Sequence, residues 1–222
     1  MLEPLAPDLW SATTTMRLVA GVILPIRMVV VRLPDGSLVL VSPIPLDDAL
    51  AAEVASLGPV GYLVGPNLLH HLSLGPARQR FPGATLLGAP GLAAKRSDLS
   101  FDGEIGGAPW GDALTAHLVA GAPRISEVVL HHAASGTLIT TDLLFNIEKA
   151  ANRRSALVLA LAGTRGRLAR SREWWFLVKD RAAFNQSLDR ILALPFDRVT
   201  VAHGEVVKAH GRDQMARIFG RA

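Results

Sequence analysis

Short apolar runs separated by turn residues dominate the chain, and they predict alternating strands and helices. Residues 27–31 and 38–41 flank Pro34-Asp35-Gly36-Ser37, a pattern that is typical of a β-hairpin. Residues 46–57 carry apolar side chains at helical spacing, and Gly58-Pro59 ends the predicted helix. The same patterns predict strands over residues 60–64, 84–87, 114–119, 127–131, 137–141 and 198–202, and helices over residues 75–81 and 180–192.

The order of these elements predicts one domain over residues 1–222, built from two similar α/β halves. A chain of 222 residues is long enough to bury a substantial core, and no long linker or short-period repeat divides it. Half of the residues are hydrophobic, which excludes a disordered chain.

The absence of cysteine and of long apolar stretches excludes several classes of protein. Thiolate zinc fingers and iron–sulfur clusters are excluded, so any metal would need nitrogen and oxygen ligands. The longest apolar run, residues 19–33, is interrupted by Pro25, Arg27 and Arg32, and no membrane span is expected. Glu3 and Asp8 lie where a signal peptide would carry basic and then apolar residues, so a cytoplasmic location is expected.

The net charge of +4 comes mostly from arginine. The densest basic stretch contains Arg153, Arg154, Arg165, Arg167, Arg170 and Arg172. Because no aromatic side chain is interspersed among them, the stretch predicts a loop that faces solvent or an anion. No nucleic-acid partner is expected.

Four candidate metal ligands, His70, His71, Asp142 and His203, lie just beyond predicted strands. Polar residues at strand ends commonly line sites in layered α/β folds. Imidazole and carboxylate groups bind zinc, iron and manganese, and a catalytic site needs three or four such ligands plus room for water. Adjacent histidines on a strand would point to opposite faces, so His70 and His71 can share an ion only on a loop or helix start, which residues 66–69 make plausible.

These residues lie in segments that resemble the metallo-β-lactamase-like superfamily, and more narrowly an uncharacterised bacterial family within it. The resemblance covers nearly the whole chain and rests on residues 27–43, 62–71, 121–145 and 201–204. It implies an α/β fold of the metallo-β-lactamase type, a four-layer αββα sandwich. It also implies that the site lies where the strand ends of the two halves meet.

The superfamily signature, His-x-His-x-Asp-His followed by a later His, an Asp and a final His, is only partly present. His71, Asp142 and His203 match the last His of the first motif, the bridging Asp and the final His, while His70 stands at the position of the signature Asp. Ser42 replaces the acidic residue usually found at the end of the second hairpin strand. The positions of the missing imidazoles hold Pro66, Leu68 and Ala122. The pattern therefore implies one divalent transition metal or none.

Two functions are compatible with this pattern. In the first, a metal-dependent hydrolase, His70, His71, Asp142 and His203 hold one ion, either zinc or else iron or manganese, which acidifies a water for attack on an ester, amide or phosphodiester. Asp142 and His70 are the predicted catalytic residues. The alternative is a non-catalytic relative that binds a small ligand or a protein partner, because two metals normally clamp the attacking and leaving oxygens together.

Four further positions are candidates for binding or orienting roles, and three of them have a second interpretation. Asn67 binds the substrate or forms the turn after Pro66, and Arg154 is expected to bind an anionic small-molecule substrate. Glu127 orients a ligand histidine or is a solvated acid at a strand edge. The aromatic cluster Trp174-Trp175-Phe176 contributes to a pocket wall or a homodimer contact, or it packs between layers.

Overall fold

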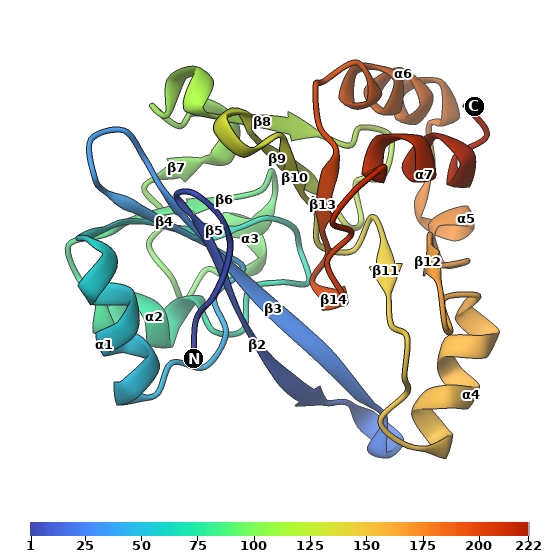
Figure 1. Cartoon of the computed structure of the whole chain (residues 1–222), viewed down its shortest axis with the longest axis horizontal. Helices are drawn as coiled ribbons and strands as arrows, with labels where there is room; N and C mark the ends of the chain where they lie inside the picture. Colours follow the sequence, from blue (N-terminus) through green and yellow to red (C-terminus); the bar gives the residue numbers. More distant parts are fainter. Residues whose placement is uncertain (222) are drawn as a thin grey trace.

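Side chains of the first sheet alternate between two apolar layers. The computed structural model describes residues 1–221, and the seven strands of its first sheet pair in chain order (Figure 1). These strands are β1 (Glu3–Ala6), β2 (Leu9–Arg17), β3 (Ile23–Arg32), β4 (Leu38–Val41), β5 (Val60–Gly65), β6 (Thr85–Gly88) and β7 (Gly103–Glu104). Strands β1 to β4 are antiparallel to their neighbours, and β4 to β7 run parallel. The predicted hairpin is confirmed, with Val30 of β3 opposite Leu40 of β4.

Three helices cover the outer face of this sheet: α1 (Asp48–Leu57), α2 (Leu74–Arg80) and α3 (Leu92–Lys95). Met28 and Val30 pack with these helices, whereas Val29 and Val31 face the opposite way. Helix α1 begins slightly later than the pattern predicts, because the Asp47 side chain accepts a hydrogen bond from Leu50 N at 2.8 Å and caps the helix.

The second half contributes two smaller sheets and four helices. One sheet has the order β13 (Arg198–Thr200), β10 (Thr137–Ile139), β9 (Val128–His132) and β8 (Leu114–Leu118). The other has the order β12 (Leu168–Ala169), β11 (Phe145–Asn146) and β14 (His203–Gly204). The helices are α4 (Arg153–Ala162), α5 (Trp174–Leu177), α6 (Arg181–Leu192) and α7 (Gly211–Ile218). Short 3₁₀ turns are η1 (Val19–Gly21), η2 (Ile105–Gly107), η3 (Gly111–Ala113) and η4 (Ala133–Ser135).

Side chains on the strands of the second half also alternate between two apolar layers, which gives the fold four layers. Leu130 and Ile139 pack against the inner face of the first sheet, while Val129 and Leu138 pack outward against α6 and α7. The order of layers is therefore helices, sheet, sheet, helices, and the predicted αββα sandwich is confirmed. Within residues 1–221, no helix combines the length and the apolar character needed to cross a membrane.

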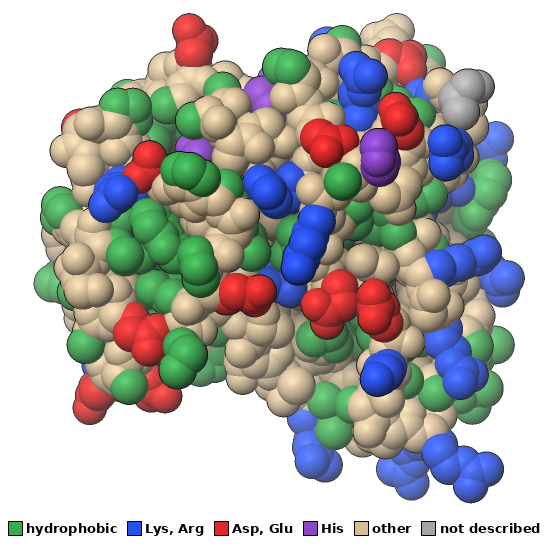
Figure 2. All heavy atoms as spheres, in the orientation of Figure 1, with side chains coloured by type: hydrophobic (Ala, Val, Ile, Leu, Met, Phe, Trp, Pro, Cys, Tyr) green, Lys and Arg blue, Asp and Glu red, His purple; other side chains and the backbone are tan. Residues whose placement is uncertain are grey.

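The arginine-rich stretch differs from its prediction as a loop. Its first part is helix α4, which Asn152 caps by accepting a hydrogen bond from Ser155 N at 2.8 Å. The helix buries Ser155 and Leu159 and exposes Leu157 and Leu161 along with Arg153 and Arg154. Residues 156–162 are apolar throughout and therefore lack the helical spacing that would have indicated a helix. Figure 2 shows Lys and Arg side chains gathered along the lower edge of the molecule, over α4 and the hairpin between β2 and β3.

Candidate metal centre

Three of the predicted ligands converge from three separate parts of the chain. His70 lies in the loop between β5 and α2, Asp142 follows β10, and His203 begins β14. His70 Nε2 lies 3.3 Å from His203 Nε2 and 3.3 Å from Asp142 Oδ2, and His203 Nε2 lies 3.1 Å from Asp142 Oδ1. The three side chains thus point one potential ligand atom each at a common centre.

This spacing fits a metal ion. Bonds of about 2.0–2.2 Å to a tetrahedral ion place neighbouring ligand atoms roughly 3.3–3.5 Å apart, close to the distances in the cluster. His203 Nδ1 donates to Pro25 O at 2.7 Å, which in the neutral ring leaves Nε2 with a free lone pair. Two imidazoles and one carboxylate suit zinc, iron or manganese.

Ser42 fixes the ring of His70 from the other side. Its Oγ lies 2.8 Å from His70 Nδ1, so the hydroxyl oxygen can accept a hydrogen bond from Nδ1–H, which leaves the lone pair of Nε2 free to bind a metal. Ser42 directly follows β4 and has a φ of 53°, a left-handed conformation that is uncommon for a serine. This turn at the strand end points the hydroxyl at His70.

The Ser42 hydroxyl gives a direct prediction about metal affinity. We expect Ser42→Ala to weaken metal binding about 10- to 100-fold, as is typical for groups that orient a ligand histidine. Competition titration with a chromophoric chelator would measure the change, with exposed Ser56→Ala as the control. Equal affinities for Ser42→Ala and Ser56→Ala would show that the hydroxyl of Ser42 does not orient His70.

Charge also favours a cation at this position. Burial by itself raises the pKa of Asp142. When Nε2 of each ring carries a proton in place of a metal, the charge of His70 and hydrogen bonds from His203 and His70 outweigh burial and hold that pKa well below its usual range. Burial by itself lowers the pKa of His70, and the Asp142 carboxylate outweighs it and raises that pKa. The cluster therefore keeps a buried anion that needs a positive partner, which can be a proton or a metal ion.

Asn67 connects two of the ligand segments. Its side chain is fully buried, and its Oδ1 accepts hydrogen bonds from Leu69 N and His70 N, both at 2.7 Å. Its Nδ2 donates to Asp142 Oδ2 at 2.7 Å and to Glu127 Oε2 at 2.6 Å. Asn67 therefore forms the predicted turn after Pro66, and it does not line the cavity in which a substrate would lie.

Glu127 holds the Asp142 segment from within the core. It is fully buried, which contradicts the reading of a solvated acid. Its carboxylate accepts hydrogen bonds from Thr141 N at 2.8 Å, Asp142 N at 3.1 Å and Leu143 N at 3.3 Å, and from Thr141 Oγ1 at 2.7 Å. Burial, reinforced by the Asp142 charge, raises the pKa of Glu127. Glu127 thus orients the aspartate ligand, and not a histidine.

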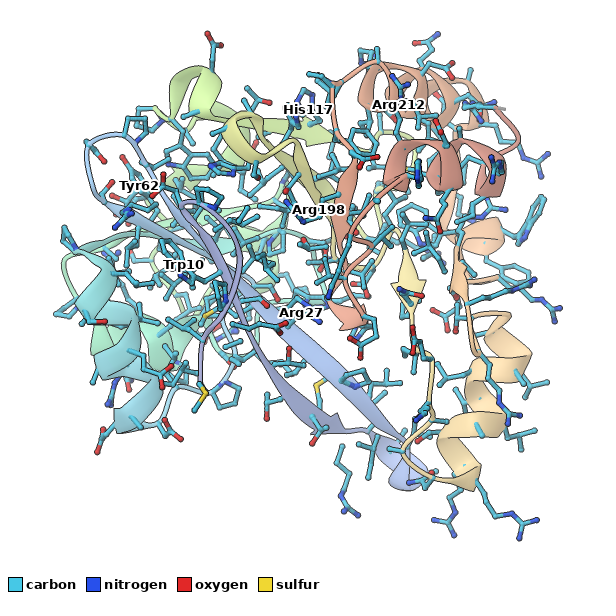
Figure 3. The ribbon with its side chains drawn as sticks, in the orientation of Figure 1. Trp10, Arg27, Tyr62, His117, Arg198 and Arg212 are labelled. Carbon is cyan, nitrogen blue, oxygen red and sulfur yellow. The ribbon has the colours of Figure 1, made fainter. Side chains whose placement is uncertain are left out.

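The pattern gave no indication of the role of Arg27, which anchors the segment around His203. Arg27 lies on β3 and is buried, and Figure 3 shows it pointing toward β14. It donates to Val201 O at 3.2 Å and to Gly204 O at 2.7 Å, the carbonyls on either side of His203. The His203 ring also stacks on Phe145, with ring centroids 4.9 Å apart. An arginine inside an apolar strand was the only sequence signal for this contact.

The structure does not bring His71 into the cluster. Its Nδ1 lies 3.1 Å from Arg96 Nη1, which also donates to His71 O at 2.8 Å. Burial and the charges of Lys95 and Arg96 lower the pKa of His71, so the ring is neutral and its Nδ1 accepts from Arg96. Arg154 also lies apart, since it is exposed on α4 and donates to Ala20 O at 3.2 Å.

A cavity of about 410 Å³ opens at the cluster, and His70, Asp142, His203 and Ser42 all line it. His71 lines it as well. Trp174, the buried member of the aromatic cluster, donates from its indole nitrogen to Asp142 O at 2.8 Å, whereas Trp175 and Phe176 are exposed. The site thus combines a possible metal centre with space for a small molecule.

The chain matches the model of a known protein family. A family model described as "Domain of unknown function (DUF4336)" matches residues 8–159. The chain belongs to the DUF4336 family. No curated protein matches it.

Solved structures show the fold of this DUF4336 protein. The metallo-β-lactamase from Pontibacter korlensis is 16% identical, with a TM-score of 0.64, and the match covers 97% of this chain and 98% of that one. A metallo-β-lactamase from Erythrobacter litoralis is 15% identical, with a TM-score of 0.66 and coverage of 100% and 96%. FIM-1 from Pseudomonas aeruginosa in its mono-zinc form is 12% identical, with a TM-score of 0.62 and coverage of 100% and 95%. The DUF4336 chain has the metallo-β-lactamase fold.

The cluster of the DUF4336 chain offers three potential ligands, which are fewer than a site for two metal ions needs. Within residues 1–221, His70, Asp142 and His203 form the one group of three or more potential ligands that could hold an ion. The family match ends at residue 159, so it includes His70 and Asp142 but not His203. His203 therefore joins this group of potential ligands on the geometry and not on the family match.

Proposed function

We propose that this protein is a metal-dependent hydrolase with one metal ion held by His70, Asp142 and His203. The observation that carries the proposal is the convergence of three potential ligand atoms, from separate strand ends, in the lining of a cavity. The fold it shares with metallo-β-lactamases, one of which is a mono-zinc form, supports the same chemistry. Zinc is the first candidate, and iron and manganese suit the same ligands.

The residues around the cluster have separate roles in the proposed reaction. A metal at this site would supply a Lewis acid that activates water and polarises the bond to be broken. His70 and His203 are held in their metal-binding tautomers by Ser42 and Pro25 O. The lowered pKa of Asp142 suits a permanently ionised ligand better than a general base. His71 lines the cavity, and with Nδ1 facing Arg96 its Nε2 carries the proton and can donate a hydrogen bond to a substrate.

Metal analysis with an activity assay tests the proposal. We expect protein purified without an affinity tag to contain about one equivalent of zinc, iron or manganese, or to take up one equivalent on titration. Removing it with a chelator should abolish hydrolysis of p-nitrophenyl butyrate and lower the melting temperature, and adding it back should restore both. Binding at 100 times Kd would stabilise the fold by roughly 2.7 kcal/mol. Full activity in metal-free protein would refute the proposal.

A second candidate function is that of a non-catalytic binding protein. Residues 1–221 contain one group of potential ligands, and this observation favours the second function. Hydrolases with two metal ions use both ions to stabilise the attacking and leaving oxygens. Under this function the metal would bind and stabilise the protein as above, but neither p-nitrophenyl butyrate nor bis-p-nitrophenyl phosphate would be hydrolysed.

A further inference from the structure

Resting on the proposed function, we propose that the substrate is an uncharged carboxylic ester whose apolar acyl chain occupies the cavity. Its carbonyl would lie at the metal cluster. In the reaction, the oxygen of water bonds to the carbonyl carbon and the ester C–O bond breaks. One proton of water ends on the leaving alcohol, and the other is released as the carboxylate forms. The lining of the cavity carries this inference.

The walls of the cavity are mostly apolar away from the cluster. Leu24 and Ile26 come from β3, Ile44 follows β4, and Val158 and Leu159 come from α4. Polar groups line the cavity at the cluster and Ser42, and Ser73, Thr164, Ser171 and Glu173 add four further polar side chains among the apolar ones. A ligand that matches both the cluster and the apolar walls has one compact polar group and an apolar chain.

The charges lining the cavity argue against an anionic substrate. Within residues 1–221, no Lys or Arg side chain lines it, whereas Asp142 and Glu173 do. A phosphodiester or a free carboxylate would therefore meet negative charge without a neighbouring cation from the protein chain. Arg154, the predicted anion-binding residue, instead contacts Ala20 O on the outer surface.

The cavity mouth exposes apolar side chains that a bound chain would cover. Leu69 is 52% exposed, Leu72 is 65% exposed and Val158 is 43% exposed, and all three line the cavity. They come from the loop before α2 and from α4, on different sides of the opening. Such a grouping of exposed apolar side chains is typical of a binding surface. At about 30 Å³ per group, the 410 Å³ cavity has room for roughly a dozen methylene-sized groups.

The chain-length dependence of hydrolysis tests the inference. With p-nitrophenyl esters from acetate to decanoate, we expect kcat/KM to rise roughly fourfold for each added methylene until the cavity is full. Val158→Trp should fill part of the cavity and shift the optimum to shorter esters. Leu157→Trp is the matched control, because Leu157 is the neighbouring residue on α4, is 62% exposed and does not line the cavity. Equal chain-length profiles for the two variants would overturn the inference.

A non-hydrolysable probe separates this inference from the proposed function. Calorimetry with 2-hexanone and 2-decanone, which carry a neutral carbonyl on an alkyl chain, should show at least tenfold tighter binding of the longer ketone. It should also show that Val158→Trp weakens the binding of 2-decanone more than Leu157→Trp does. If esters are not hydrolysed but this pattern holds, the hydrolase proposal fails and the acyl-chain site stands. If bis-p-nitrophenyl phosphate is hydrolysed and chain length has no effect, the hydrolase proposal stands and the acyl-chain site is refuted.

Discussion

Replacing His203 with alanine is expected to lower metal affinity more than 100-fold, whereas His71→Ala is expected to leave it close to that of the unmodified protein. His203 Nε2 faces both other ligands of the cluster, at 3.1 Å and 3.3 Å, so its removal leaves two protein ligands. Removing a group that merely orients a ligand costs about 10- to 100-fold, and removing a ligand should cost more. His71 is hydrogen-bonded to Arg96 and contributes no atom to the cluster.

The two histidine variants form a matched pair, because both side chains line the same cavity. Metal affinity, measured by competition with a chromophoric chelator, is the deciding quantity, since His71→Ala can alter hydrolysis by removing a hydrogen-bond donor. Circular dichroism would check that both variants remain folded. Similar losses of affinity in the two variants would show that His71 also binds the ion.

Replacing Glu127 with alanine is expected to lower the free energy of unfolding by about 3–5 kcal/mol. The substitution removes the acceptor of three backbone N–H groups, those of Thr141, Asp142 and Leu143, and of the Asn67 amide. Each buried donor left without a partner costs about 1–3 kcal/mol, and part of this cost is relieved by local rearrangement. Urea denaturation of the metal-free protein would measure the change without a contribution from metal binding.

Two control variants show whether the loss comes from hydrogen bonding. Glu127→Gln keeps one acceptor oxygen and the shape of the side chain, so we expect it to be destabilised by roughly half as much. Asp112→Ala removes an exposed carboxylate from η3 and should leave the unfolding curve unchanged. If Glu127→Ala matched Asp112→Ala, the buried network would not stabilise the fold.

Much of the fold followed from local patterns, because each strand of a two-sheet core must alternate its side chains between layers. The hairpin of β3 and β4 is confirmed, and so is the helix predicted over residues 180–192, which is α6 and which Asp180 caps by accepting from Ala183 N. Position at strand ends also predicted that His70, Asp142 and His203 would meet. These features depend on periodicity and on sheet geometry, both of which a single sequence contains.

The rest of the site depends on contacts between distant segments. His70 and His71 are adjacent in the sequence and follow the same strand. Their side chains are separated by the turn that Asn67 holds and by the contact of His71 with Arg96. The partners of Glu127 and Arg27 lie 14 to 177 residues away in the chain. Local spacing contains no information about such contacts, so the groups that orient the ligands could not be predicted.

The separation of the proposed ligands along the chain would make metal binding a late event in folding. His70 and His203 are 133 residues apart, and Asp142 and His203 are 61 apart. Until β14 pairs with β11 and Arg27 holds the carbonyls beside His203, the chain offers an ion at most two of the three ligands. Contacts of this range form slowly because they close long loops. The ion would therefore bind the fully folded chain more tightly than a chain in which β14 has not yet paired with β11.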